Sequence, residues 1–127
     1  MTGNEYQKLA MRTNDGLCTE RLGNAVFCIG GQFEYDMGGI VNASLGLSGE
    51  TGELNDMIKK AIFHGHELEE EKLKKELGDI MWYVAMMCES FGFGMDEIMQ
   101  MNIDKLKARY PEGFSEYDSQ HRKAGDV

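Results

Sequence analysis

Four carboxylates stand in two pairs along the chain, and their spacing is typical of a metal site. Glu50 and Glu53 are three positions apart, as are Glu76 and Asp79, so each pair spans about one helical turn. Glu50 and Asp79 are equally far from the junction of residues 64 and 65, and so are Glu53 and Glu76. An antiparallel hairpin folded at residues 64–65 would bring all four to one level. Oxygen donors of this kind predict Mg²⁺ with several waters retained, with Mn²⁺ as the alternative.

The same carboxylates border apolar helix faces. On a helical wheel Glu50 falls inside the apolar stripe of its helix and Glu53 on its edge, while Glu76 and Asp79 flank the stripe of the next helix. Burying one unpaired carboxylate costs several kcal/mol, and neighbouring carboxylates repel each other. One such pair alone would indicate only a solvated face. Two pairs in matched register favour a bound cation.

A second group of side chains could hold phosphate. Asn102, Lys105 and Arg109 share one face of a helix expected over residues 95–110. If the chain folds back at residues 92–94, residues 105–109 would come near the level of residues 77–81. Lys and Arg suit phosphate oxygens. The alternative interpretation is that these cations merely neutralise the acidic helix.

The pattern along the chain predicts an all-α protein of four to five helices in a single domain over residues 1–127. Alternating strand patterns are nearly absent, and only one proline interrupts the chain. Residues 15–37 fit either a short helix or a wrapping loop. The helical core is expected over about residues 40–110, and a loose polar tail over about 112–127. The expected helices cover about residues 4–13, 40–63, 69–91 and 95–110.

Composition excludes several classes of partner. The 127 residues carry 13 Lys and Arg against 22 Asp and Glu, a formal net charge of -9. Such a chain is repelled by nucleic acid and by anionic membranes, so neither is expected as a partner. Three cysteines without a CxxC spacing fit a reducing, cytoplasmic location. The sequence has no run of the ~20 apolar residues needed to span a bilayer, and the first residues lack a signal peptide's apolar stretch.

One segment is apolar on every side. Residues 80–88 read IMWYVAMMC, whereas a surface helix has one apolar stripe. Large apolar patches are rarely left exposed, so we expect a homo-oligomer, a dimer or a dimer of dimers, with this helix near the two-fold axis. The alternative is that this segment is the central helix of a monomer.

Three motifs carry a resemblance to a known family. GETGELNDMIKK, ELGDIMWYV and NIDKLKARYPEGF together resemble the MazG family of all-α nucleoside triphosphate pyrophosphohydrolases, over about residues 40–114. The resemblance implies a helical bundle and Mg²⁺-dependent cleavage between the α and β phosphates, with monophosphate and pyrophosphate as products. It also implies a homodimer or homotetramer. By position, the implied metal ligands are Glu50, Glu53, Glu76 and Asp79, and the implied substrate-binding residues are Asn102, Lys105, Arg109 and Tyr83.

One departure from the family pattern affects the mechanism. Many members have EExxE in the first acidic helix, and its first Glu is often assigned to activating water. Gly49 stands at that position here, a form that some branches share, so no general base is assigned. Two other functions stay open: a phosphoribosyl-ATP pyrophosphohydrolase-like enzyme, and a non-catalytic metal-binding helical dimerisation module. Lys105 beside the acidic cluster would favour catalysis, while the preferred base and sugar cannot be read from the sequence.

Overall fold

The computed structural model describes residues 1–122, and every regular element in that range is helical. This confirms the all-α class. No helix among the described residues is long and apolar enough to cross a membrane. The elements in chain order are α1 (Gly3–Ala10), a 3-10 turn (Met11–Thr13), α2 (Cys18–Ala25), a π-helical turn (Val26–Gly30), α3 (Gly31–Phe33), α4 (Met37–Phe63), α5 (Glu70–Phe91), α6 (Met95–Arg109) and α7 (Glu116–Gln120).

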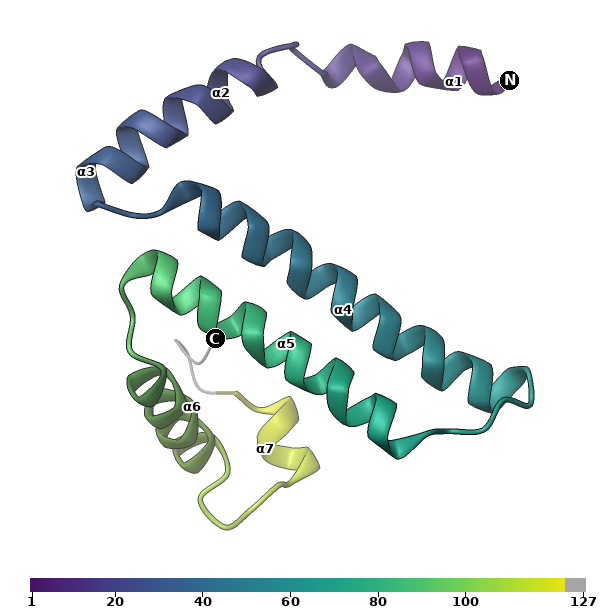
Figure 1. Ribbon diagram of the computed structural model, residues 1–127, viewed down its shortest axis with the longest axis vertical. Helices are drawn as coiled ribbons and strands as arrows, with labels where there is room; N and C mark the ends of the chain where they lie inside the picture. Colours follow the sequence, from purple (N-terminus) through teal and green to yellow (C-terminus); the bar gives the residue numbers. More distant parts are fainter. Residues whose placement is uncertain (123–127) are drawn as a thin grey trace.

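The two longest helices, α4 and α5, form an antiparallel hairpin that dominates the tertiary structure (Figure 1). The Asp36 side chain caps α4 by accepting a hydrogen bond from the Gly39 N–H at 3.0 Å. Gly65 turns the chain with a φ of 70°, and Gly92 ends α5 in the left-handed region with a φ of 73°. Two glutamates in the first turn of α5 suit the positive end of its dipole.

Small residues let α4 and α5 approach closely at the end of the hairpin away from the turn. Gly39 and Ser90 are both buried, and a methyl group at Gly39 would lie less than 3.0 Å from the Ser90 Oγ. The Asp36 N–H also donates to the Ser90 carbonyl at 3.0 Å. Like the paired carboxylates, Gly39 and Ser90 are equally far from the turn at residues 64–65. The register predicted from the carboxylates therefore extends to this end.

Helix α4 begins earlier than expected, at Met37 instead of residue 40. In the sequence, the Gly38-Gly39 pair favours a helix that begins only after Gly39. In the structure Asp36 caps the helix, and Gly39 is needed for its contact with Ser90.

Residues 1–33 form a helical arm, which resolves the ambiguity over residues 15–37 in favour of helix. The arm runs beside the start of α4 and then diverges from it (Figure 1). Its π-helical turn contacts α4, where a methyl group at Gly30 would lie 2.6 Å from the Met37 Cγ. Leu22 and Phe27 remain 58% and 81% exposed. The arm therefore covers little of the hairpin.

The C-terminal segment corrects one expectation. The sequence predicts a loose tail over 112–127, but α7 forms at Glu116–Gln120. Its cap is Ser115, whose Oγ accepts a hydrogen bond from the Asp118 N–H at 2.9 Å. The prediction misses this Ser-initiated cap because the following helix is short and has no apolar period. Residues 123–127 lie outside the described range.

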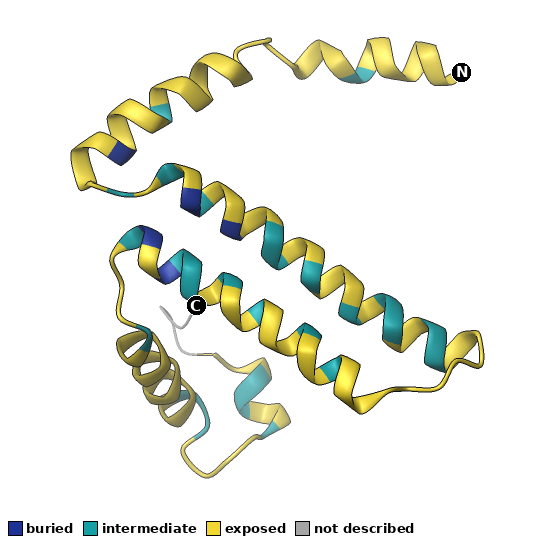
Figure 2. Cartoon of the chain, viewed as in Figure 1, coloured by how far each residue is buried: buried dark blue, intermediate teal, exposed yellow. Residues whose placement is uncertain are grey.

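Burial is slight for a chain of this length (Figure 2). Among the described residues, the buried hydrophobic side chains are Ala43 and Cys88, both near the small-residue end of the hairpin. Met81 and Trp82 in the middle of α5 are 63% and 59% exposed. The all-round apolar segment therefore keeps much of its surface open in a single chain.

Candidate metal centre

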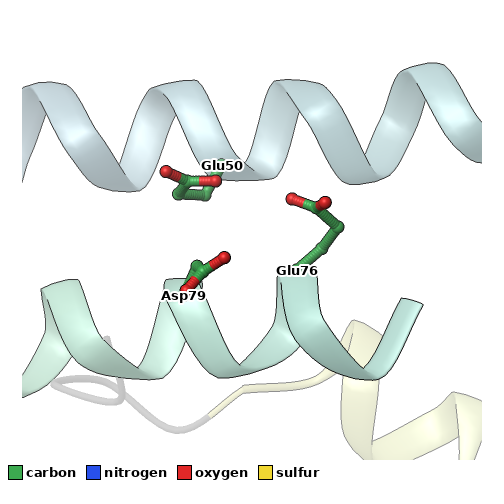
Figure 3. Close-up of side chains that lie close together, drawn as sticks. All are labelled: Glu50, Glu76 and Asp79. Carbon is green, nitrogen blue, oxygen red and sulfur yellow. The ribbon is translucent and has the colours of Figure 1, made fainter. Parts of the chain in front are cut away.

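Three carboxylates converge between α4 and α5. Glu50 points from α4 toward α5, and Glu76 and Asp79 point back from successive turns of α5 (Figure 3). One oxygen from each carboxylate lies within 4.8 Å of the other two. Glu50 and Glu76 are half-buried and Asp79 is exposed. This is the level at which the spacing from the turn predicts a meeting of the two helices.

The proximity of these carboxylates disfavours the ionised form of Glu50. Partial burial of Glu50, and then the negative charges of Glu53, Asp79 and Glu76, raise the pKa of the Glu50 carboxyl above its ordinary value. A cation bound among these oxygens would offset both effects, because its charge favours the ionised carboxylates. An all-oxygen donor set of this charge fits a hard divalent cation such as Mg²⁺.

Several lysines of the hairpin are engaged elsewhere. Asp56 accepts ion pairs from Lys59 and Lys60 at 2.8 and 2.6 Å, and these lower the pKa of its carboxyl to about 2. On α5, Lys72 pairs with Glu69 and Lys74 with Glu71, both at 2.6 Å. These are local pairs one turn apart on the same helix or at its start. Glu50, Glu76 and Asp79 take part in none of these four ion pairs.

Glu53 stands one turn further along α4 and is exposed. It is outside the group of three that lies within 4.8 Å. It lines a surface hollow beside that group, so the predicted quartet is a triad with a fourth carboxylate at the rim. The hollow is lined by Gly49, Gly52, Glu53, Asp56, Met57 and Glu76. Sequence reasoning did not single out Asp56 or Met57, which follow Glu53 by about one turn.

Tyr83 lies on the side of the cluster away from the hairpin turn. It lies one turn beyond Asp79 on α5 and is half-buried. Its ring meets Trp82 edge-on, with centroids 5.0 Å apart and planes at 90°. Its other neighbour is the Gly46 backbone, because a methyl group there would lie less than 3.0 Å from the Tyr83 Cε1. Tyr83 therefore packs between α4 and α5 one turn away from Asp79.

The predicted phosphate-binding residues lie on α6, which does not pack along α5 as α4 does. Met99 and Leu106 on α6 are 55% and 41% exposed. Extensive packing between α5 and α6 is absent from the described part of the chain, and the level that residues 105–109 share with residues 77–81 stays a prediction. After the turn at residues 92–94, α6 is drawn on the side of α5 opposite α4 (Figure 1). Asn102, Lys105 and Arg109 thus stand on a separate helix from the carboxylates.

The chain is similar to known proteins over most of its helical core. The family described as MazG nucleotide pyrophosphohydrolase domain matches residues 42–114, which include α5 and α6 and nearly all of α4. The Gene 37 protein of Mycobacterium phage L5 is 34% identical over 79 residues, covering 59% of this chain and 69% of that protein. No solved structure matches the chain.

Proposed function

We propose that this chain, which belongs to the family of MazG nucleotide pyrophosphohydrolase domains, hydrolyses a nucleoside triphosphate to its monophosphate and pyrophosphate in a Mg²⁺-dependent reaction. The observation that carries the proposal is the convergence of Glu50, Glu76 and Asp79 within 4.8 Å. A net charge of -9 would repel a triphosphate unless cations intervene. The cluster offers the place for those cations.

The carboxylates of Glu50, Glu76 and Asp79 would hold the metal, with Glu53 as a further ligand from the rim of the hollow. When bound, Mg²⁺ polarises phosphoryl oxygens, neutralises charge on the leaving pyrophosphate and lowers the pKa of water. The chain's own contribution is to fix the donors on two rigid helices and to leave the hollow at Glu53 open to solvent. We assign no general base, since Gly49 offers no side chain for that role.

Substrate contacts are proposed on two elements. Asn102, Lys105 and Arg109 on α6 would hold phosphate or sugar oxygens, because Lys and Arg match phosphate geometry. Tyr83, beside Asp79, would contact the nucleoside part. These roles follow the family resemblance position by position.

We further propose that the chain works as a homo-oligomer in the cytoplasm. Met81 and Trp82 leave a large apolar area open on α5. A two-fold contact between copies would cover it. Cys18 and Cys28 are free, exposed thiols, which suit a reducing compartment.

The test is a product analysis with every common ribo- and deoxyribonucleoside triphosphate, resolved by ion-exchange chromatography. We expect monophosphate and pyrophosphate in equal amounts, and complete loss of turnover with EDTA. Asp79→Ala should lose activity, whereas Glu71→Ala should keep it. Glu71 is the matched control because its 80% exposed carboxylate lies on the same helix outside the cluster. Release of orthophosphate from the γ position would contradict the proposal, as would EDTA-resistant turnover.

A further inference from the structure

Beside the carboxylates, α4 and α5 approach each other closely between Gly46 and the ring of Tyr83. A methyl group built on Gly46 would lie less than 3.0 Å from each of three ring atoms, the Tyr83 Cε1, Cζ and Cδ1. Three ring atoms therefore rest against one α-carbon. Ordinary contact of such a methyl group begins near 3.4 Å. Any side chain at position 46 would have to displace either the ring or the helix.

This contact is on the level next to the carboxylates. Gly46 lies one turn before Glu50 on α4, and Tyr83 lies one turn after Asp79 on α5. The two are equally far from the turn at residues 64–65. The ring is also held from the side by Trp82, whose indole meets it edge-on. The helix separation at this level is thus set by a flat ring on a bare backbone.

The geometry points to Gly46 as a positioning residue for the metal centre, acting through Tyr83 to fix the separation of α4 and α5 at Glu50 and Asp79. The inference rests on the metal centre of the proposed function. A methyl group at position 46 reaches ordinary contact only if its distance from the ring grows from under 3.0 Å to 3.4 Å. Metal–ligand distances tolerate only about 0.2 Å, and Mg²⁺ demands near-ideal geometry. A displacement that is small enough for helix packing to tolerate would therefore still distort the coordination of a cation bound between α4 and α5.

The chain contains a matched control. Gly78 is also inside a hairpin helix, next to Asp79, but a methyl group there meets nothing within 4 Å. Gly46→Ala and Gly78→Ala remove the same backbone freedom and add the same atom. Both substitutions raise helix propensity. They differ in whether the new methyl group strikes the facing helix.

Titration calorimetry with Mn²⁺ alone, on the full chain, tests the inference without reference to turnover. We expect Gly46→Ala to weaken Mn²⁺ binding at least tenfold and Gly78→Ala to change it less than twofold. In a Tyr83→Ala background the methyl group has room, so Gly46→Ala should then have no effect on Mn²⁺ binding. In a Tyr83→Phe background, where the ring remains, the tenfold loss should persist.

Three results would overturn the inference: Mn²⁺ binding by Gly46→Ala equal to that of Gly78→Ala, an equal loss in the Tyr83→Ala background, or no Mn²⁺ binding by the wild type. The third also removes the proposed function, whereas the first two leave it standing. If Gly46→Ala alone fails to fold by circular dichroism, the Gly46→Ala/Tyr83→Ala protein must be helical. If neither of these two proteins folds, Gly46 has a role other than its contact with Tyr83, and the inference is overturned too.

Discussion

The exposed middle of α5 makes a quantitative prediction about assembly. Trp82 is 59% exposed, which is roughly 130 Å² for a residue that buries about 150–250 Å² when covered. Covering that area is worth about 3 kcal/mol per copy at about 25 cal/mol per Å². A factor of ten in affinity corresponds to about 1.4 kcal/mol. Trp82→Glu should therefore raise the dissociation constant of the oligomer by at least about 100-fold.

Sedimentation velocity over a range of protein concentrations measures this constant. Phe63→Glu is the matched control, because Phe63 is 76% exposed but lies at the hairpin turn. We expect the control to associate like the wild type and the Trp82→Glu protein to approach the monomer mass of 14.3 kDa. A wild type that remains at that mass at high micromolar concentration would refute the reasoning. So would a Trp82→Glu protein that associates as tightly as the Phe63→Glu control.

Three further predictions concern the carboxylates. Glu53→Ala and Asp79→Ala should each lower activity by orders of magnitude while the metal-free melting temperature holds or rises, since repulsion is relieved; a melting temperature many degrees lower with activity retained would make the two residues structural. The raised pKa of Glu50 means that the fold binds its proton more tightly than the unfolded chain does, so metal-free stability should fall as pH rises above the ordinary value of 4.5. Glu50→Gln should flatten this part of a melting-temperature profile, and an unchanged slope would count against the origin assigned to it. The lowered pKa of Asp56 acts in the opposite direction: the stability that it contributes is present above pH 3.8 and is lost as pH falls toward about 2. Asp56→Asn should remove that part of the acid transition in a denaturation curve, and a curve that matches the wild type would contradict this.

The distances of residues from the turn at residues 64–65 were enough to predict the register of α4 against α5. In an antiparallel hairpin, residues at equal distances from the turn share a level, which is why Glu50 and Asp79 meet. The same spacing from the turn brings Gly46 to the level of Tyr83, so this contact also follows from the register of the hairpin.

The position of α6 could not be predicted in this way. Its direction depends on the dihedral angles at residues 92–94, and a glycine such as Gly92, with a φ of 73°, leaves that direction open in the sequence. Helix α7 was missed for a different reason. Five residues are too few to show an apolar period, so only the cap at Ser115 could have indicated it.

The placement of the triad within residues 50–79 also bears on how the chain folds. The cluster needs only the hairpin of α4 and α5, and the connection at residues 64–69 is short, so its closure costs little entropy. We therefore expect the carboxylates to come together early in folding, without any contact from the arm of residues 1–33 or from α6. If so, a cation that stabilises this hairpin would raise the rate of folding more than it lowers the rate of unfolding. The cation would then promote the folding of the hairpin as well as the reaction.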